Sequence, residues 1–388
     1  MTEKKLNNGL TVVVANVGDT PSMSLTVNVG HVNEPKLGIA ALFEKVLLMQ
    51  STGIQAVYGG TITSYFTGFL NRETEMTMQK MSNLVVAPHF NAELIKTAAE
   101  DIIKHTLDRA PLPKRQMKLL YKHRAFGDAN KVWDTELYIK SIRSYGVTDL
   151  QEFADKYMTA KNMVLVVSGK FVVPSEVEQL AEKYFGQVAP GKRLRVDNEL
   201  YTGGFASLPA FSSYRQVMMG WDVSRLEGVA EANVLMSMLI NRLERSFVGT
   251  DADVEVKIAG YYGLRTLRIS VKSDIGGDIN SYIDIVCANI RRIRTTLASE
   301  RRMETSRNQA MCEKLFTFSQ QQAGSVETAW QLLGRGQMYD INERINSTWQ
   351  VTAHLVREVA RDIFAQPLTY VVYANKPFYS YEEVMAKL

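Results

Sequence analysis

The sequence predicts an α+β protein made of two similar units, each with a mainly antiparallel sheet packed against helices. Three observations support this fold class. In each half of the 388 residues, strand patterns come first, helical patterns follow, and one apolar strand comes last. The Val-Asn-Val-Gly segment at residues 27–30 has a counterpart, Val-Met-Met-Gly, 190 residues later at 217–220. The length also favours two domains, because domains typically have about 100–200 residues.

The first half opens with two predicted strands and a helix. Residues 10–14 (Leu-Thr-Val-Val-Val) follow an Asn-Asn-Gly turn, and residues 24–29 alternate polar and apolar side chains, which is the period of a strand with one buried face. A helix is predicted from about residue 38 to residue 49, because its apolar side chains cluster at helical spacing.

A second amphipathic helix and a buried strand close the first half. Thr148 and Asp149 are typical of a helix start, and apolar residues then recur at helical spacing from Leu150 to Tyr157. Residues 163–167 (Met-Val-Leu-Val-Val) form a continuous apolar strand.

The second half repeats this plan with a growing offset. The predicted helix at 355–363 and the strand at 370–373 lie about 206 residues after their counterparts, so about sixteen residues would be inserted. Chance similarity is the alternative, since strand–Gly–helix patterns are common.

A segment rich in Pro, Gly and charge separates the two halves and is typical of an exposed linker. We therefore predict a first unit over residues 1–189, a linker over 190–204, and a homologous second unit over 205–388.

Composition excludes several classes of protein. The 45 Lys and Arg residues nearly balance the 41 Asp and Glu residues, and a net charge of +4 does not indicate a nucleic-acid or membrane-surface binder. The two cysteines, Cys287 and Cys312, exclude a four-cysteine zinc site within the chain. The N-terminal residues contain lysines but no apolar stretch after them, so we expect a cytoplasmic protein.

Several segments together resemble the pitrilysin/insulinase family of zinc metallopeptidases, over nearly the whole chain. The half-length members of that family are the most similar, such as mitochondrial processing peptidase subunits and the core proteins of the cytochrome bc1 complex. The segments that carry the resemblance are Leu-Asn-Asn-Gly-Leu at 6–10, Gly59-Gly60-Thr61, Phe-Asn-Ala-Glu-Leu at 90–94, and Tyr-Gly-Val-Thr-Asp-Leu at 145–150. The resemblance implies that Gly59, Gly60 and Thr61 form an edge strand that binds substrate.

The zinc motif of this family is degenerate in the chain. The motif is an inverted His-x-x-Glu-His on the helix after the early strand, in which two histidines at i and i+4 bind zinc and the glutamate takes a proton from zinc-bound water. The aligned residues are Ala41, Glu44 and Lys45. Alanine has no donor atom, and a charged lysine has no lone pair and repels a dication. Glu44 is thus an inactive remnant of the general base, and we expect no metal or other cofactor.

The third ligand of the family comes from a later helix, at a position between Glu100 and Lys104. Glu100 is the carboxylate that we expect there, and it could form an ion pair with Lys45 that joins the two helices without zinc. His105 lies on the same helix, and its alternative interpretation is an ordinary solvent or core histidine. The family's substrate-holding Arg and Tyr align with Val248 and Glu255, so neither is retained.

The resemblance and the missing ligands together predict a non-catalytic subunit, which is not an enzyme by itself. It would bind peptide or complete the chamber of an active zinc-peptidase partner, because full-length relatives use four such units and this chain supplies two. The partner would be an active half-length subunit or a second copy of the chain, and we expect neither nucleic acid nor membrane as a partner. The alternatives are a homodimeric scaffold without peptidase function and a zinc endopeptidase with atypical ligands.

A basic cluster in the second half contains Arg291, Arg292, Arg294, Arg301 and Arg302. Glutamates lie nearby in the sequence, so a solvated helix face is the interpretation we prefer. The alternative is a surface that binds an anion or a partner.

Overall fold

The computed structural model divides into two compact units, which we describe separately. It describes residues 1–15, 20–86, 88–127, 134–170, 172–194, 201–226, 229–261, 264–319, 323–336, 338, 340–375 and 377–388, so part of the predicted linker lies outside the described residues. Unit 1 comprises Met1–Arg109, Asp134–Asp197 and Leu315–Tyr339, and unit 2 comprises Ala110–Trp133, Asn198–Lys314 and Asp340–Leu388.

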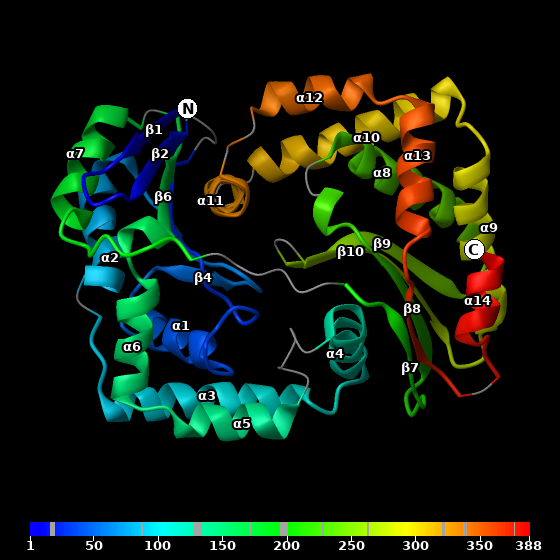
Figure 1. Ribbon diagram of the computed structural model, residues 1–388, viewed down its shortest axis with the longest axis horizontal. Coiled ribbons are helices and arrows are strands. Elements are labelled where there is room, and N and C mark those ends of the chain that lie inside the picture. Colours follow the sequence, from blue (N-terminus) through cyan, green and yellow to red (C-terminus); the bar gives the residue numbers. More distant parts are fainter. Residues whose placement is uncertain are drawn as a thin grey trace. The chain divides into compact units, whose positions relative to one another are not determined.

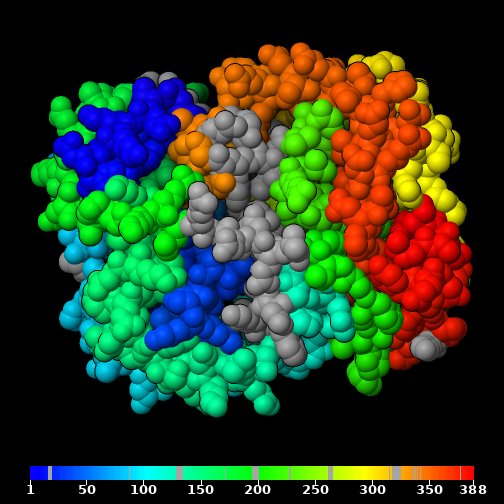
Figure 2. Space-filling view, in the orientation of Figure 1, coloured from blue at the N-terminus to red at the C-terminus, as the bar shows by residue number. Residues whose placement is uncertain are grey.

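Unit 1 is built on a six-stranded sheet in the order β1-β2-β6-β3-β5-β4 (Figure 1). Its pairs are antiparallel except for β2 and β6, which are parallel. The residues of β1 are exposed, and they form the dark-blue surface in Figure 2. The strands are β1 (Thr2–Lys5), β2 (Thr11–Ala15), β3 (Ser22–Val27), β4 (Gln55–Tyr58), β5 (Thr63–Gly68) and β6 (Met163–Ser168).

The helices of unit 1 include those predicted from the sequence near residues 38–49 and 148–157. Leu42, Phe43 and Val46 of the first of these are fully buried, as their spacing predicts. The helices are α1 (Ile39–Met49), α2 (Thr74–Val86), α3 (Ala92–Arg109), α5 (Thr135–Ser144), α6 (Val147–Tyr157), α7 (Pro174–Phe185) and α11 (Ala323–Arg335), with the short 3-10 helices η1 (Asn71–Glu73) and η3 (Ala160–Asn162).

Unit 2 contains a five-stranded sheet in the order β7-β11-β8-β10-β9. The strands are β7 (Gly204–Leu208), β8 (Tyr214–Asp222), β9 (Ala252–Tyr261), β10 (Leu264–Asp274) and β11 (Thr369–Tyr373). The helices are α4 (Pro113–Phe126), α8 (Ala230–Phe247), α9 (Ile279–Thr295), α10 (Glu300–Ser319), α12 (Ile341–Gln350), α13 (Ala353–Phe364) and α14 (Tyr381–Lys387), with the 3-10 helix η4 (Ser224–Leu226).

The two sheets share one topology once β1 is set aside. In both, the order is first, last, second, fourth and third strand of the unit, and the first and last strands are parallel. In both, one helix follows the second strand, and another precedes the last strand. The α+β fold class with mainly antiparallel sheets is therefore confirmed, and the matching order supports the predicted two-copy plan.

Each unit also contains one helix from the other half of the sequence. In unit 2, α4 packs on β7 and β11, and its Tyr121 hydroxyl donates to Thr266 Oγ1 at 2.7 Å. In unit 1, α11 packs on β3 and β6, and its Trp330 Nε1 donates to Ser64 Oγ at 2.7 Å. The division predicted from the sequence, residues 1–189 and 205–388, therefore differs from the compact units at these two helices.

Two further features concern surfaces. None of the helices in the described residues combines the length and apolar content that a bilayer-spanning helix requires.

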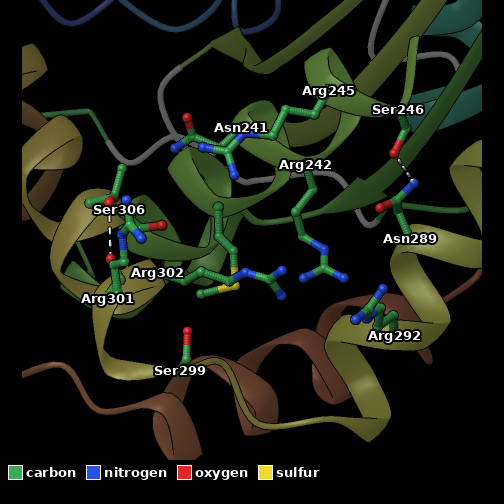
Figure 3. A pocket seen from close by; sticks show the side chains of 12 residues that line it. Asn241, Arg242, Arg245, Ser246, Asn289, Arg292, Ser299, Arg301, Arg302 and Ser306 are labelled. Atoms are coloured by element: carbon green, nitrogen blue, oxygen red, sulfur yellow. Dashed lines mark hydrogen bonds between the residues drawn. The ribbon is translucent and has the colours of Figure 1, made fainter. Parts of the chain in front are cut away.

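Of the predicted basic cluster, Arg292, Arg301 and Arg302 line a pocket in unit 2, which is drawn in Figure 3.

Candidate functional site

The helix with the degenerate motif, α1, starts at a fixed point in unit 1. Gly38, directly before the helix, has φ 82°, a left-handed conformation that glycine adopts at little cost. The Glu34 carboxylate accepts hydrogen bonds from the backbone N–H groups of Gly38 at 2.6 Å and Ala40 at 2.9 Å. It thus binds N–H groups that have no partner within the helix, and its negative charge suits a helix N-terminus.

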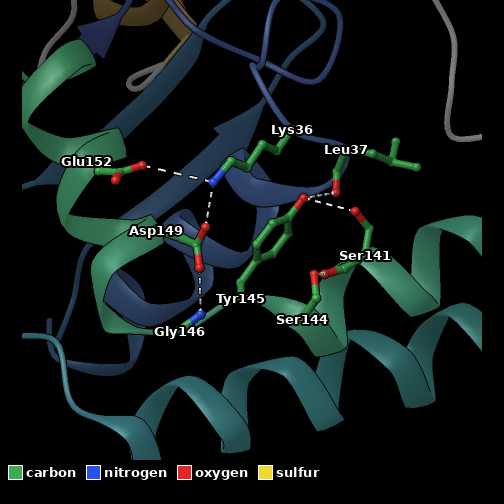
Figure 4. Close-up of polar contacts among 8 residues, drawn as sticks. All are labelled: Lys36, Leu37, Ser141, Ser144, Tyr145, Gly146, Asp149 and Glu152. Carbon is green, nitrogen blue, oxygen red and sulfur yellow. Dashed lines mark hydrogen bonds and ion pairs between the residues drawn. The ribbon is translucent and has the colours of Figure 1, made fainter.

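The loop before α1 is tied to α5 and α6 by a polar network (Figure 4). Lys36 Nζ lies 2.6 Å from Asp149 Oδ1, and the Tyr145 hydroxyl donates to the Leu37 carbonyl at 2.7 Å. Asp149 also accepts from the Gly146 N–H at 3.0 Å. The hydrogen bond from Lys36 lowers the pKa of Asp149, so this carboxylate is ionised at neutral pH. The network fixes the position of α1 relative to its neighbouring helices.

An ion pair joins α1 to α3 at the position that the resemblance predicts for the family's metal site. Lys45 Nζ contacts the Asp101 carboxylate, and its hydrogen bond lowers the pKa of Asp101. His105 Nε2 lies 3.5 Å from the same carboxylate, on the next turn of α3. Glu100, the partner predicted from the sequence, lies 4.0 Å from Lys96 instead and is largely exposed. The predicted ion-pair partner of Lys45 is therefore wrong by one residue. Successive side chains on a helix point about 100° apart, so this shift changes which side chain faces Lys45.

Glu44, which aligns with the general base of the family, is the one carboxylate of α1, and its pKa is shifted. Burial raises its pKa to about 7, although the neighbouring Lys45 charge opposes the shift. Glu44 in turn contributes to raising the pKa of Tyr65, for which burial is the larger cause. Burial by itself accounts for the raised pKa, and a carboxyl group in such an environment does not require a metal.

The residues at this site do not fit a zinc ion. Ala41 and Lys45 have no lone pair to offer at the two histidine positions, and Asp101 is already bound by the lysine ammonium. Within the described ranges, no group of three or more His, Cys, Asp or Glu side chains is placed to hold a metal. Because these side chains cannot hold a zinc ion, they provide no zinc-bound water that Glu44 could deprotonate.

The predicted substrate-binding segment, residues 59–61, forms the turn between β4 and β5. The two edge strands of this sheet are β1 and β4, and β4 ends at Tyr58, directly before the turn. The carbonyls of Gly59 and Gly60 accept hydrogen bonds from the backbone N–H groups of His31 at 3.3 Å and Val32 at 2.7 Å. These carbonyls therefore bind the loop after β3, and a role of this segment in binding substrate stays a prediction.

The two aligned clamp positions lie on different elements of unit 2. Val248 is at the end of α8, with 80% of its side chain exposed, whereas Glu255 lies on β9 and pairs with Lys257 at 2.5 Å. Neither side chain can hold a peptide as an arginine or a tyrosine does.

Comparisons with known proteins agree with this description. Residues 145–310 match the family profile described as the peptidase M16 inactive domain. The mitochondrial cytochrome b-c1 complex subunit 2 of Schizosaccharomyces pombe is 23% identical over 199 residues, which cover 45% of this chain and 44% of that relative. The aligned segment thus spans less than half of the relative's length.

Two solved structures share the fold over nearly the whole chain. One is a chain of complex III2 from Candida albicans with Inz-5 bound, with a TM-score of 0.84, 13% identity, and coverage of 100% of this chain and 99% of that one. The other is a protease from Helicobacter pylori, with a TM-score of 0.81, 14% identity, and coverage of 97% and 99%. The resemblance predicted from the sequence is confirmed: residues 145–310 match the inactive domain of peptidase M16, and the chain is related to non-catalytic subunits such as subunit 2 of the cytochrome b-c1 complex.

Proposed function

We propose that the chain is a non-catalytic subunit that completes the chamber of an active zinc-peptidase partner and contributes to binding its peptide. The observation that carries this proposal is the pair of Lys45 and Asp101, which joins α1 to α3 at the residues that the resemblance aligns with the zinc motif. An ammonium group there keeps the two helices together but supplies no Lewis acid and no activated water. The fold of the peptidase is thus retained without its chemistry.

The names of the relatives support a role in an assembly. One relative is a subunit of a multi-subunit complex, and one similar structure is that of such a complex. Two units in one chain are also half of the four that enclose peptide in full-length relatives, as the resemblance implies. The partner that fits is a half-length chain with an intact His-x-x-Glu-His motif, and a second copy of this chain is the alternative.

The test is peptide cleavage by three preparations: the wild-type chain alone, the chain with an active half-length partner, and the double variant Ala41→His with Lys45→His alone. The double variant restores two ligands around Glu44, and Asp101 is the carboxylate placed to be the third. We expect cleavage with the partner present and no more than trace cleavage by either lone chain. Zinc content after dialysis shows whether the double variant has bound metal.

Three outcomes would contradict the proposal. Vigorous hydrolysis by the lone double variant would show that the chain has a complete chamber of its own. About one tightly held zinc per wild-type chain would show a metal site with atypical ligands. A stable homodimer that does not associate with any active half-length chain would favour the scaffold function instead.

A further inference from the structure

Five arginine side chains line one pocket in unit 2, where α8, α9 and the start of α10 meet. Its volume is about 530 Å³, within the range of small-molecule sites. No acidic residue is among the described side chains that line it. The lining consists of Met238, Asn241, Arg242, Arg245, Ser246, Asn289, Arg292, Ser299, Arg301, Arg302, Thr305 and Ser306.

The arginines have like-charged neighbours and no carboxylate partners. Figure 3 shows the side chains of Arg242, Arg292 and Arg302 directed toward the same open space. None of the five forms an ion pair with a carboxylate in the described part of the chain. The buried Nε of Arg242 has no hydrogen-bond partner there either. Burial, and then the charges of Arg292 and Arg302, lower the pKa of Arg242, which agrees with this crowding.

The start of α10 adds to the excess of positive charge. Arg301 and Arg302 lie in its first turn, where the helix dipole is positive and cations are unfavourable. The one acidic residue of that turn, Glu300, is engaged by Arg307 at 2.6 Å. Guanidinium groups and the positive end of the α10 dipole therefore lie at the pocket, and none of the described lining side chains is a carboxylate that could balance them.

We propose that this pocket binds a small anion that carries two or more phosphoryl groups. Guanidinium forks bind phosphate oxygens in a bidentate manner, and the hydroxyl and amide groups of Ser299, Thr305 and Asn289 can complete the contacts. Five cations exceed what one phosphate can neutralise, and the volume exceeds its size. None of the described lining side chains is an aromatic ring on which a nucleobase could stack, so the recognised chemistry is the phosphate cluster itself. A free polyphosphate and a phosphorylated lipid headgroup share that chemistry.

The test is calorimetric titration of the full chain with tripolyphosphate in low-salt buffer. We expect one site per chain, with an affinity that falls steeply as salt rises, because the contacts are ionic. Arg292→Gln and Arg302→Gln should each weaken binding at least tenfold. Arg291→Gln is the matched control, because it removes the same charge one position away on α9, outside the pocket, and it should change the affinity less than twofold.

A second readout separates binding from folding. Without ligand, Arg302→Gln should melt at the same temperature as the wild type or higher, because it relieves repulsion, but it should lose the stabilisation by tripolyphosphate. Vesicles with and without a phosphorylated inositol lipid form the other arm: binding to them identifies a headgroup, and binding of soluble tripolyphosphate alone identifies a free anion. If neither binds, or if Arg291→Gln weakens binding as much as Arg292→Gln does, the proposal is wrong.

Discussion

The helix that follows the second strand differs between the two units. In unit 2 this helix is α8, and Val234, Leu235 and Leu239 on its inner face are fully buried. In unit 1 it is α1, which carries partly buried Glu44 and Lys45 beside its apolar face. Leu235 lies 190 residues after Lys45, the offset at which the sequence repeats.

This difference shows how a site can lose its chemistry and keep its place in the fold. The inner face of the helix in unit 2 is held by apolar contacts, and the position that matches Lys45 is the fully buried Leu235. The helix of unit 1 retains a polar neighbourhood, in which a lysine has replaced a metal ligand and pairs with the facing helix. The positions that align with the family's zinc motif therefore do not form an apolar core like the one around Leu235.

The largest expected effect on stability comes from exchanging the side chains at the matching positions 45 and 235. Leu235→Lys places a charge in an apolar core and should lower the free energy of unfolding by about 4 kcal/mol or more. Lys45→Leu removes an ion pair whose two side chains are 36% and 37% exposed, so it should change that free energy by no more than about 1 kcal/mol. Urea unfolding of both variants measures the difference. Similar losses in both would show that the Lys45 pair is as essential as the core of unit 2.

A charge reversal at Lys45 should have an intermediate effect. Lys45→Glu places a third carboxylate beside Glu44 and Asp101, and we expect a loss of about 2 kcal/mol that decreases at high salt. Lys45→Met keeps the length of the side chain and should cost less than about 1 kcal/mol. Melting temperatures at low and high ionic strength distinguish the two variants. If neither moves the melting temperature, Lys45 is a surface residue without a structural role.

The third prediction concerns the pH dependence of Glu44. Its folded-state pKa of about 7 lies above the ordinary value of 4.5, so the fold favours the protonated form. The stability that this gives is fully present below pH 4.5 and is lost as pH rises through 7. Glu44→Gln is neutral at every pH, and it should therefore stabilise the chain by about 3 kcal/mol at pH 8 but hardly at all near pH 4.5. A gain that does not depend on pH would exclude burial of the charge as its cause.

Much of the fold follows from local patterns in the sequence, whereas pairings between distant segments do not. Alternation in β3 and the apolar run in β6 predicted these strands within a few residues. The single buried face that the alternation also predicted is wrong, because Ser22, Ser24 and Thr26 on the polar face of β3 are buried as well. The exchange of α4 and α11 was not predicted, since an amphipathic pattern shows that a helix buries one face but not against which sheet.

For the candidate site too, the sequence predicted what depends on local spacing and missed what depends on distant segments. Ala41, Glu44 and Lys45 lie together on α1 because their spacing fixes their common face. The partner on α3 was missed by one residue, because the segment before that helix has no fixed alignment with the family. The arginine pocket was only partly visible: Arg292, Arg301 and Arg302 stood out as a cluster, but Arg242 and Arg245 come from a helix about fifty residues earlier.

The smallest expected effect tests how the exchanged helix α4 is held in unit 2. The buried Tyr121 hydroxyl donates to Thr266 and lies so close to Gly220 that a Cβ there would be 1.7 Å from it. Tyr121→Phe removes this hydrogen bond but keeps the ring, and Thr266 retains the Ala259 carbonyl as an acceptor at 3.3 Å.

We therefore expect Tyr121→Phe to cost about 1 kcal/mol, the usual net value of one hydrogen bond. The control is Tyr184→Phe, because the Tyr184 hydroxyl donates to the exposed Glu75 and should contribute almost nothing to the free energy of unfolding. Hydrogen exchange should show the loss first in α4, β7 and β11, because α4 covers those strands. A loss spread evenly over both units would mean that α4 does not open separately from the rest of the protein. In that case the exchanged helices would be part of one cooperative core, and the comparison between the two units would apply to their sites but not to their stabilities.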